Sequence, residues 1–467
     1  MKRKGLLMML CTAALSVACM ASVTAEETVQ ENESMLMAGA SKVSITPPEE
    51  MWGEMALIDG NTPEGAYNDL FVRSLVIDNG EKEIAVVVFE KVDIEVPELK
   101  SGISEATGIP IENLILTATH NHTDVYGGEE YDALILEKAI ESVEQAEAAL
   151  QPAKYGYGEG NSYININRDK QQEEGYWMQD ANPEGYSDKT LAMIKFVDMD
   201  DNLIAVFMNY CMHPMAAYDS VDVDGKHKMS GNITGVTCDY IEDRYEGAVA
   251  LWTIGAAGNQ NPYMIASPTY YYDGYPEMKD LPDGAGLAIM ELQGQQHALD
   301  AIKILNTIEC TEEEMPISFE YTTIELPAQK APEGADMAYN RLLADNLVRK
   351  VTGATEIPER KLVTMEDDPD NPVQMHMQLA VLGDIALVGV PAEIYCEIGR
   401  DMKEASLLEH TIIMEFTDEY CGYILDKGSA DKDVFQSFSS VKPGSSDELI
   451  INGMLSMENS YLEKAAE

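Results

Sequence analysis

The segment Leu114-Ile-Leu-Thr-Ala-Thr-His120-Asn-His122-Thr-Asp124-Val-Tyr-Gly127-Gly128 is the starting point for interpreting the chain. It begins as a short apolar run, typical of a buried strand, and changes abruptly to two histidines, an aspartate and a glycine pair. Alternate residues of an extended chain point to the same side, so His120 and His122 can present two imidazoles to one site. An H-x-H pair alone is a weak signal, and a purely structural role for both histidines stays open at this point.

Three further apolar segments also end in polar, turn-rich sequence. They lead into Asn209-Tyr-Cys-Met-His213-Pro214, Gly255-Ala-Ala-Gly258-Asn259-Gln-Asn261-Pro262 and Pro391-Ala-Glu393. Sites in α/β proteins gather beyond the carboxyl ends of strands, so we expect these segments to converge on one pocket. Two imidazoles and a carboxylate are the usual ligands of a catalytic zinc ion, which activates water for attack on a carbonyl carbon.

The rest of the pattern predicts a mixed α/β fold, with central sheets flanked by helices. Hairpins are expected at 71–89, 191–208 and 377–390, and an edge strand at 317–326. Apolar residues recur at helical spacing in 136–150, 233–245, 287–305 and 337–347. The stretch 155–186 is rich in Gly, Tyr and Asn without clear periodicity, so we expect a long functional loop there.

Residues 1–25 have the three parts of a secretory signal peptide: a basic start, an apolar run from Leu6 to Ala21, and Ser22-Val-Thr-Ala25. We expect an exported protein with this leader, a flexible acidic tether at 26–36 and one domain at 37–467. Leu15-Ser-Val-Ala-Cys19 approaches a lipoprotein cleavage site but has its leucine one place early, so a lipid anchor on Cys19 is the less favoured alternative. No later segment has the length and apolarity of a transmembrane helix.

The chain is strongly acidic, with a formal net charge of −51. Loss of the leader removes three cations and no acidic residue, which makes the charge −54. Such a surface repels phosphate backbones, which argues against nucleic acid as a partner. Five cysteines follow residue 25, too few and too scattered for a disulfide framework, and small buried hydrophobes are the favoured interpretation: Cys211, Cys238, Cys310, Cys396 and Cys421.

Several separate stretches, in order over nearly the whole mature chain, resemble the neutral ceramidases. They are Ala40-Ser-Lys-Val-Ser-Ile-Thr-Pro47, Thr117-Ala-Thr-His-Asn-His-Thr123, Asn165-Ile-Asn-Arg168, the segments that contain His213, Asn261 and Glu393, Tyr420-Cys-Gly-Tyr423 and Val441-Lys-Pro-Gly444. The resemblance implies the N-terminal catalytic domain of that family, a zinc-dependent amidohydrolase that cleaves N-acylsphingosine. It also implies four zinc ligands, namely His120, His213, Glu393 and Tyr423, with Tyr420 as the competitor for the last position.

His122 and Arg168 match positions at which the family polarises the scissile carbonyl and holds the developing oxyanion. An imidazole and a guanidinium suit that task, and His122 would also deliver a proton to the leaving amine. At a substrate-binding position, Asn261 replaces the serine of the family's Gly-Asp-x-Ser-Pro, so the substrate can differ from ceramide. Because the sequence ends at Glu467, we expect no counterpart of the β-sandwich domain that follows the catalytic domain in full-length ceramidases.

The sequence therefore predicts an exported zinc hydrolase that cleaves the amide bond of a small-molecule or lipid N-acyl substrate, with N-acylsphingosine as first candidate. Two alternatives stay open: a zinc hydrolase of another N-acyl or ester substrate, and a non-catalytic metal-binding envelope protein with a ceramidase-like scaffold. Asn261 favours the second alternative, whereas His122 and Arg168 favour an enzyme. The other histidines lack a comparable setting and are not expected to be ligands: His227, His297, His376 and His410.

Overall fold

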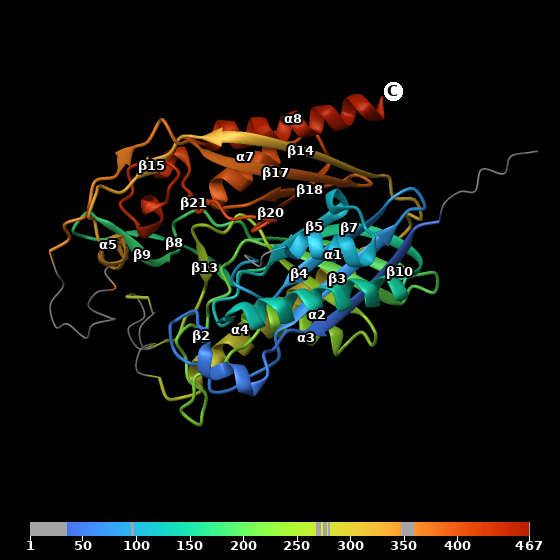
Figure 1. Ribbon diagram of the computed structural model, residues 1–467, viewed down its shortest axis with the longest axis horizontal. Helices are drawn as coiled ribbons and strands as arrows, with labels where there is room; N and C mark the ends of the chain where they lie inside the picture. The colour runs from blue at the N-terminus through green and yellow to red at the C-terminus, as the bar shows by residue number, and fades with distance from the viewer. Residues whose placement is uncertain are drawn as a thin grey trace, which may run out of the picture. The chain divides into compact units, whose positions relative to one another are not determined.

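The computed structural model describes residues 35–94, 98–267, 272–273, 278, 281–345, 347 and 359–466. In this part of the chain two β-sheets pack face to face, and helices cover the outer face of each sheet (Figure 1). The order of layers is therefore helices, sheet, sheet, helices. This is the single mixed α/β domain that the sequence predicts.

The larger sheet has eight strands in the order β12-β11-β10-β7-β1-β3-β4-β5. The strands are β1 (Met37–Ser44), β3 (Phe71–Asp78), β4 (Glu83–Phe89), β5 (Leu114–Ala118), β7 (Gln151–Asn161), β10 (Thr190–Asp198), β11 (Leu203–Tyr210) and β12 (Val249–Ile254). β4 is parallel to β5 and β11 is parallel to β12, whereas the other neighbours are antiparallel. The predicted hairpins at 71–89 and 191–208 are confirmed.

Four helices cover the outer face of this sheet: α1 (Leu99–Thr107), α2 (Glu129–Ala148), α3 (Asn232–Glu242) and α4 (Ala285–Leu305). Side chains such as Ile135, Ile233 and Met290 are fully buried between these helices and the strands. Each such burial contributes about 1.5–3 kcal/mol, so the apolar face of each helix decides its position. The helical periodicities read from the sequence are confirmed, although α2 begins at Glu129, earlier than predicted.

The smaller sheet has the order β14-β17-β18-β20. Its strands are β14 (Ile317–Leu326), β17 (Val373–Leu382), β18 (Ile385–Val390) and β20 (His410–Glu415), and β18 and β20 are parallel. One face packs on the larger sheet, and the other is covered by α7 (Cys396–Ala405) and α8 (Asp447–Ala465) (Figure 1). We did not predict α8, although Ile450, Met454 and Met457 recur at helical spacing and are buried.

The expectation of a long loop at 155–186 is wrong. The segment contains most of β7 and also β8 (Asn165–Gln171) and β9 (Trp177–Asn182), which form a three-stranded sheet with β13 (Gln260–Pro262). Gly156, Gly158 and Gly160 alternate along β7, and a Cβ on Gly158 or Gly160 would lie 2.5 or 2.7 Å from an isoleucine side chain. The last turn of α4 and the segment that follows it therefore pack directly on the strand backbone. Glycine at these positions removes the β-branched signal by which strands are recognised.

The remaining elements are short. They are η1 (Glu49–Glu54), β2 (Ala56–Leu57), η2 (Ile111–Asn113), β6 (Val125–Tyr126), β15 (Gln329–Lys330), α5 (Met337–Ala344), β16 (Glu366–Asp367), β19 (Glu393–Ile394), β21 (Tyr423–Ile424), η4 (Lys427–Ser429) and η5 (Phe435–Phe438). The pairs β2 with β6, β15 with β16, and β19 with β21 each form a two-stranded sheet.

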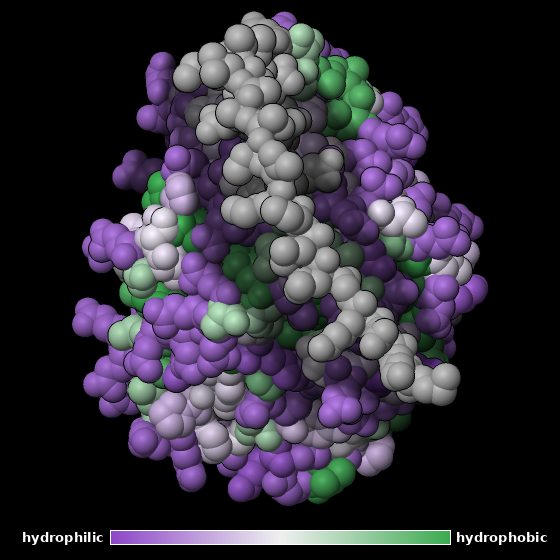
Figure 2. Space-filling view, turned by 90° about the vertical axis from the view of Figure 1, so that its right-hand side faces the viewer, coloured by the Kyte–Doolittle hydropathy of each residue, from purple (hydrophilic) through white to green (hydrophobic). Residues whose placement is uncertain are grey.

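The expected leader at 1–25 and most of the expected tether lie outside the described residues. Leu36, which we placed in the tether, is fully buried just before β1 begins. Among the described residues, no helix has the length and apolarity needed to cross a membrane. The face shown in Figure 2 is mainly hydrophilic, with hydrophobic side chains in small groups, as the charge of −51 leads one to expect.

A buried ion-pair cluster joins the larger sheet to α3. Arg73 on β3 pairs with Glu90, with Glu242 at 3.1 Å and with Asp239 at 3.3 Å. Burial raises the pKa of Glu90 to about 7, and the charge of Arg73 opposes this shift. The charged form of the Glu90 carboxylate is therefore stabilised by the guanidinium of Arg73.

We expect Arg73→Met to lower the free energy of unfolding by about 3–5 kcal/mol, because it leaves the buried carboxylate of Glu90 uncompensated. Urea denaturation measures the loss. Lys138→Met is the matched control, because Lys138 pairs with the exposed Glu141 at 2.7 Å and should change stability by less than about 1 kcal/mol. Equal losses of unfolding free energy in the two variants would contradict a special stabilising role for Arg73.

Candidate metal centre and catalytic cavity

The candidate site lies where strands of both sheets end. His120 follows β5, whose last residue is Ala118, and His213 follows β11, whose last residue is Tyr210. Glu393 opens β19 and is the register partner of Tyr423 on β21, with the two short strands parallel. The larger sheet thus provides the two imidazoles, and segments that follow the smaller sheet provide the carboxylate and the phenol.

Four potential ligand atoms from these residues lie close together. Oε2 of Glu393 is 2.8 Å from Nε2 of His213 and 3.4 Å from Nε2 of His120. The Tyr423 hydroxyl is 3.3 Å from Nε2 of His213. Ligand atoms about 2.1 Å from a tetrahedral zinc ion are roughly 3.4 Å from one another, so the residues present fit a zinc site.

Backbone carbonyls orient both histidines. Nδ1 of His120 is 2.7 Å from the carbonyl oxygen of Val92, and Nδ1 of His213 is 3.1 Å from that of Gln260. A ring that donates from Nδ1 keeps a lone pair on Nε2, which is the tautomer that a metal needs. The ring of Phe416 stacks on that of His120 with 4.1 Å between centroids and fixes its plane.

The backbone at His120 differs from our expectation. We inferred that His120 and His122 point the same way because the strand continues through them, but β5 has already ended and His120 has a left-handed φ of 62°. This conformation costs a non-glycine residue about 1–3 kcal/mol, and such strain is concentrated at functional sites. The turn nevertheless brings the two imidazoles together.

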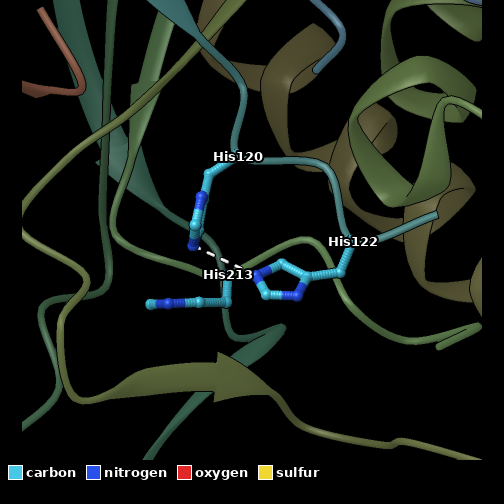
Figure 3. A group of neighbouring side chains, drawn as sticks. All are labelled: His120, His122 and His213. Atoms are coloured by element: carbon cyan, nitrogen blue, oxygen red, sulfur yellow. Dashed lines mark hydrogen bonds between the residues drawn. The ribbon is translucent and has the colours of Figure 1, made fainter. Parts of the chain in front are cut away.

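His122 is the third imidazole of the group. Its Nε2 lies 3.0 Å from Nε2 of His120, a contact that Figure 3 marks with a dashed line, and potential ligand atoms of His120, His122 and His213 lie within 4.8 Å of one another. Burial, together with His120 and His213, holds the pKa of His122 well below its usual value. The ring is therefore neutral near pH 7 and has both a donor and an acceptor nitrogen.

The hydroxyl groups of the two tyrosines have different neighbours. The hydroxyl of Tyr420 is 2.5 Å from Oε1, whereas the hydroxyl of Tyr423 lies beside His213 and 3.2 Å from a guanidinium nitrogen of Arg168. The Tyr423 hydroxyl therefore lies next to an imidazole nitrogen, whereas the Tyr420 hydroxyl lies next to the Oε1 atom of Glu393. Burial would raise the pKa of Glu393, but His120 and His213 hold it well below its usual range, so the carboxylate is charged.

Arg168 on β8 is almost completely buried, and its position is fixed by hydrogen bonds. It donates to the carbonyl oxygen of Gly258 at 2.7 Å, to Oδ1 of Asn261 at 3.1 Å and to the hydroxyl of Tyr423. The rings of Tyr423 and Phe435 lie 5.6 and 5.3 Å from the guanidinium carbon. Asn261 is fully buried, and its observed contact is with Arg168.

Two solved structures share this architecture over most of the chain. Neutral ceramidase from Pseudomonas aeruginosa matches 92% of this chain and 75% of its own length, with a TM-score of 0.66 and 17% identity. A ceramidase complexed with C2 matches 92% and 76%, with a TM-score of 0.68 and 16% identity. The chain has the ceramidase fold. No family model and no curated protein matches the sequence.

Beside the histidines, the ceramidase fold of this chain contains a cavity of about 570 Å³. This volume is within the range of small-molecule sites. His122, Arg168 and Tyr423 form part of its wall, which also includes Phe435 and apolar side chains such as Met215. A bound molecule can therefore contact the groups near the candidate metal site.

Sequence reasoning missed Glu415 and Phe416, which follow the apolar run of β20. The signal that could have identified them is β20 itself, a fifth apolar strand that ends in a polar residue. Glu415 is fully buried, and one of its oxygens accepts a hydrogen bond from the amide of Ala257 at 3.1 Å. Burial and the nearby charge of Glu393 raise the pKa of Glu415 well above its usual value, so it is held neutral.

The other histidines have separate environments in the ceramidase fold. His297 is fully buried between Trp252 and Ser162, at 3.1 and 2.8 Å, which is a structural setting. His227 lies near Asp59 and Asp219, with possible ligand atoms within 4.8 Å of one another. The five described cysteines are free thiols.

Proposed function

We propose that this chain is a zinc-dependent amidohydrolase of the ceramidase type that cleaves an N-acyl amide. The proposal is supported by one observation above all: the ligand atoms of His120, His213, Glu393 and Tyr423 converge beside His122 and Arg168 at the wall of a cavity. Zinc bound there would activate water for attack on the carbonyl carbon. N-acylated sphingoid lipids are the first substrates to test.

The chain's own residues would do the remaining work. Arg168 has a fixed orientation and can hold negative charge as it develops on the carbonyl oxygen, because its hydrogen bonds prevent reorientation during the reaction. His122 is neutral, so it can take a proton at one nitrogen and later pass it to the leaving amine. Asn261, which we expect at a substrate-binding position, would also position Arg168 through its side-chain oxygen.

Two features of the proposal go beyond the site itself. We propose that residues 1–25 direct export and that the mature chain begins with a short acidic tether. The partner is a small-molecule or lipid N-acyl compound, and the net charge of −51 argues against nucleic acid.

Removal of the metal is expected to stop hydrolysis completely and reversibly. After treatment with a chelator, turnover of a fluorogenic ceramide analogue and of a short N-acyl amide should fall to background, and added Zn²⁺ should restore it. The mechanism needs the metal for activation of water, so a fully active chelated enzyme would contradict it.

The same assay separates the enzyme from a non-catalytic metal-binding protein. Elemental analysis that finds one zinc per chain without turnover of any amide or ester would support the non-catalytic alternative. Cleavage of esters alone would support the other alternative, a zinc hydrolase of a different acyl substrate.

A further inference from the structure

The cavity next to the candidate metal centre has buried hydrogen-bond acceptors that the reaction does not use. Asp345, immediately after α5, is 4% exposed, and Gln179 on β9 is 7% exposed; both line the cavity. Among the residues that the structure describes, Oδ1 of Asp345 and Oε1 of Gln179 have no hydrogen-bond partner. A buried acceptor without a donor is destabilising, so two of them in one cavity wall need an explanation.

The two residues are neighbours. The backbone of Gln179 lies beside the Asp345 carboxylate. Burial raises the pKa of Asp345 to about 7, while Arg168 and Arg360 oppose the shift. The carboxylate is therefore under-stabilised in the free protein, and a positive charge in the cavity would stabilise it.

The charges around the cavity also favour a cation. Asp59, Asp219 and Asp345 all line it. Arg168 is the cation among the described lining residues, and its guanidinium already donates to a backbone carbonyl, to Asn261 and to Tyr423. Burial and the nearby Asp219 raise the pKa of Asp59. The cavity wall is thus rich in acceptors and negative charge, in a chain whose whole field attracts cations.

We propose that the substrate carries a cationic ammonium group, and that Asp345 and Gln179 bind it. The inference rests on the proposed function, because it names the class of N-acyl compound that the same cavity takes. A primary ammonium has three donors and one positive charge, so it can satisfy both orphaned acceptors and offset the buried carboxylate. A hydroxyl group can donate to only one of these acceptors, and it does not offset the negative charge of Asp345. Ceramide itself, which is uncharged, would leave this feature unused.

Kinetics on a matched substrate set tests the proposal. The set comprises fluorogenic N-acyl amides that differ only in a terminal ammonium, hydroxyl or methyl group. We expect the ammonium compound to have a kcat/KM about 10–100-fold above the hydroxyl compound, mostly through KM, because a charged hydrogen bond contributes about 1.5–3 kcal/mol. Asp345→Asn should remove most of this preference with little change for the methyl compound. Equal kcat/KM values for the ammonium and hydroxyl compounds in the wild-type protein would overturn the proposal.

A binding measurement keeps the test independent of turnover. Calorimetry with n-hexylammonium should show saturable binding that weakens about tenfold or more in Asp345→Asn. The control Asp370→Asn changes an exposed acid in a turn and should bind as the wild type does. Asp345-dependent binding in a protein that hydrolyses no amide would disprove the proposed function and still support the ammonium site.

Because Asp345 is buried, a second variant is needed in case the first does not fold. Gln179→Leu removes the other orphaned acceptor and leaves the carboxylate, and we expect it to weaken n-hexylammonium binding several-fold. Circular dichroism establishes that each variant is folded. Folded variants at both positions that bind n-hexylammonium as tightly as the wild type would overturn the proposal.

Discussion

Replacement of His213 with alanine is expected to abolish stoichiometric zinc binding and, with it, all amide hydrolysis. His213 is fully buried, its Nε2 contacts both Glu393 and Tyr423, and its Nδ1 is fixed by a backbone carbonyl. Removal of this ring takes away one of the two proposed imidazole ligands and leaves the buried Glu393 without one of its two imidazole partners. Elemental analysis of the purified variant measures the loss directly.

The matched control is His376→Ala. His376 is exposed and pairs with Glu419 at the surface, at 2.8 Å, so its loss should leave zinc content and turnover unchanged. His213→Ala should also be checked by circular dichroism, so that loss of metal is separated from loss of fold. A folded His213→Ala protein with one zinc per chain would rule out His213 as a ligand.

Replacement of His122 with alanine is expected to lower kcat by about 10²–10⁴-fold while zinc stays bound, because general acid-base catalysis contributes that much. His122 differs from the other two histidines in lining the cavity, where a substrate would meet it. Zinc analysis and steady-state kinetics on the same preparation measure the two effects separately.

His120→Ala provides the comparison for His122→Ala. The two rings are only 3.0 Å apart at their Nε2 atoms, so distance alone does not assign their roles. We expect His120→Ala to lose the metal. In the wild type a backbone carbonyl orients the His120 ring through Nδ1, as is usual for a histidine that binds a metal through Nε2. Equal loss of zinc in both variants would show that His122 is also a ligand, and the division of roles would have to be abandoned.

Much of the architecture was predictable because its strands and helices bury apolar side chains at regular spacing. The hairpin at 71–89 and the helix α4 follow directly from such patterns. The glycine-rich β7 did not, because its glycines leave room for the end of α4 and the segment after it, and the strand itself therefore lacks β-branched residues at these positions. Apolar periodicity therefore fails to predict a strand where neighbouring segments pack closely on its backbone.

The candidate site was predictable to a similar degree. Polar residues at the ends of apolar strands identified His120, His213 and Glu393, and the structure brings their ligand atoms together. Local sequence did not indicate the left-handed turn at His120. Asp345 and Gln179 belong to no sequence motif. Their interest comes from the structure, in which both are buried beside one cavity with acceptor atoms that lack donors among the described residues.

The distribution of the four potential ligands between the two sheets has a consequence for biosynthesis. His120 and His213 belong to the first half of the chain, whereas Glu393 and Tyr423 follow strands of the smaller sheet, near the C-terminal end. A nascent chain therefore has two histidines before it has the carboxylate and phenol that complete the set. In the proposed zinc site, tight capture of the ion would require that the last quarter of the polypeptide has folded against the rest, so metal loading would follow the completion of folding.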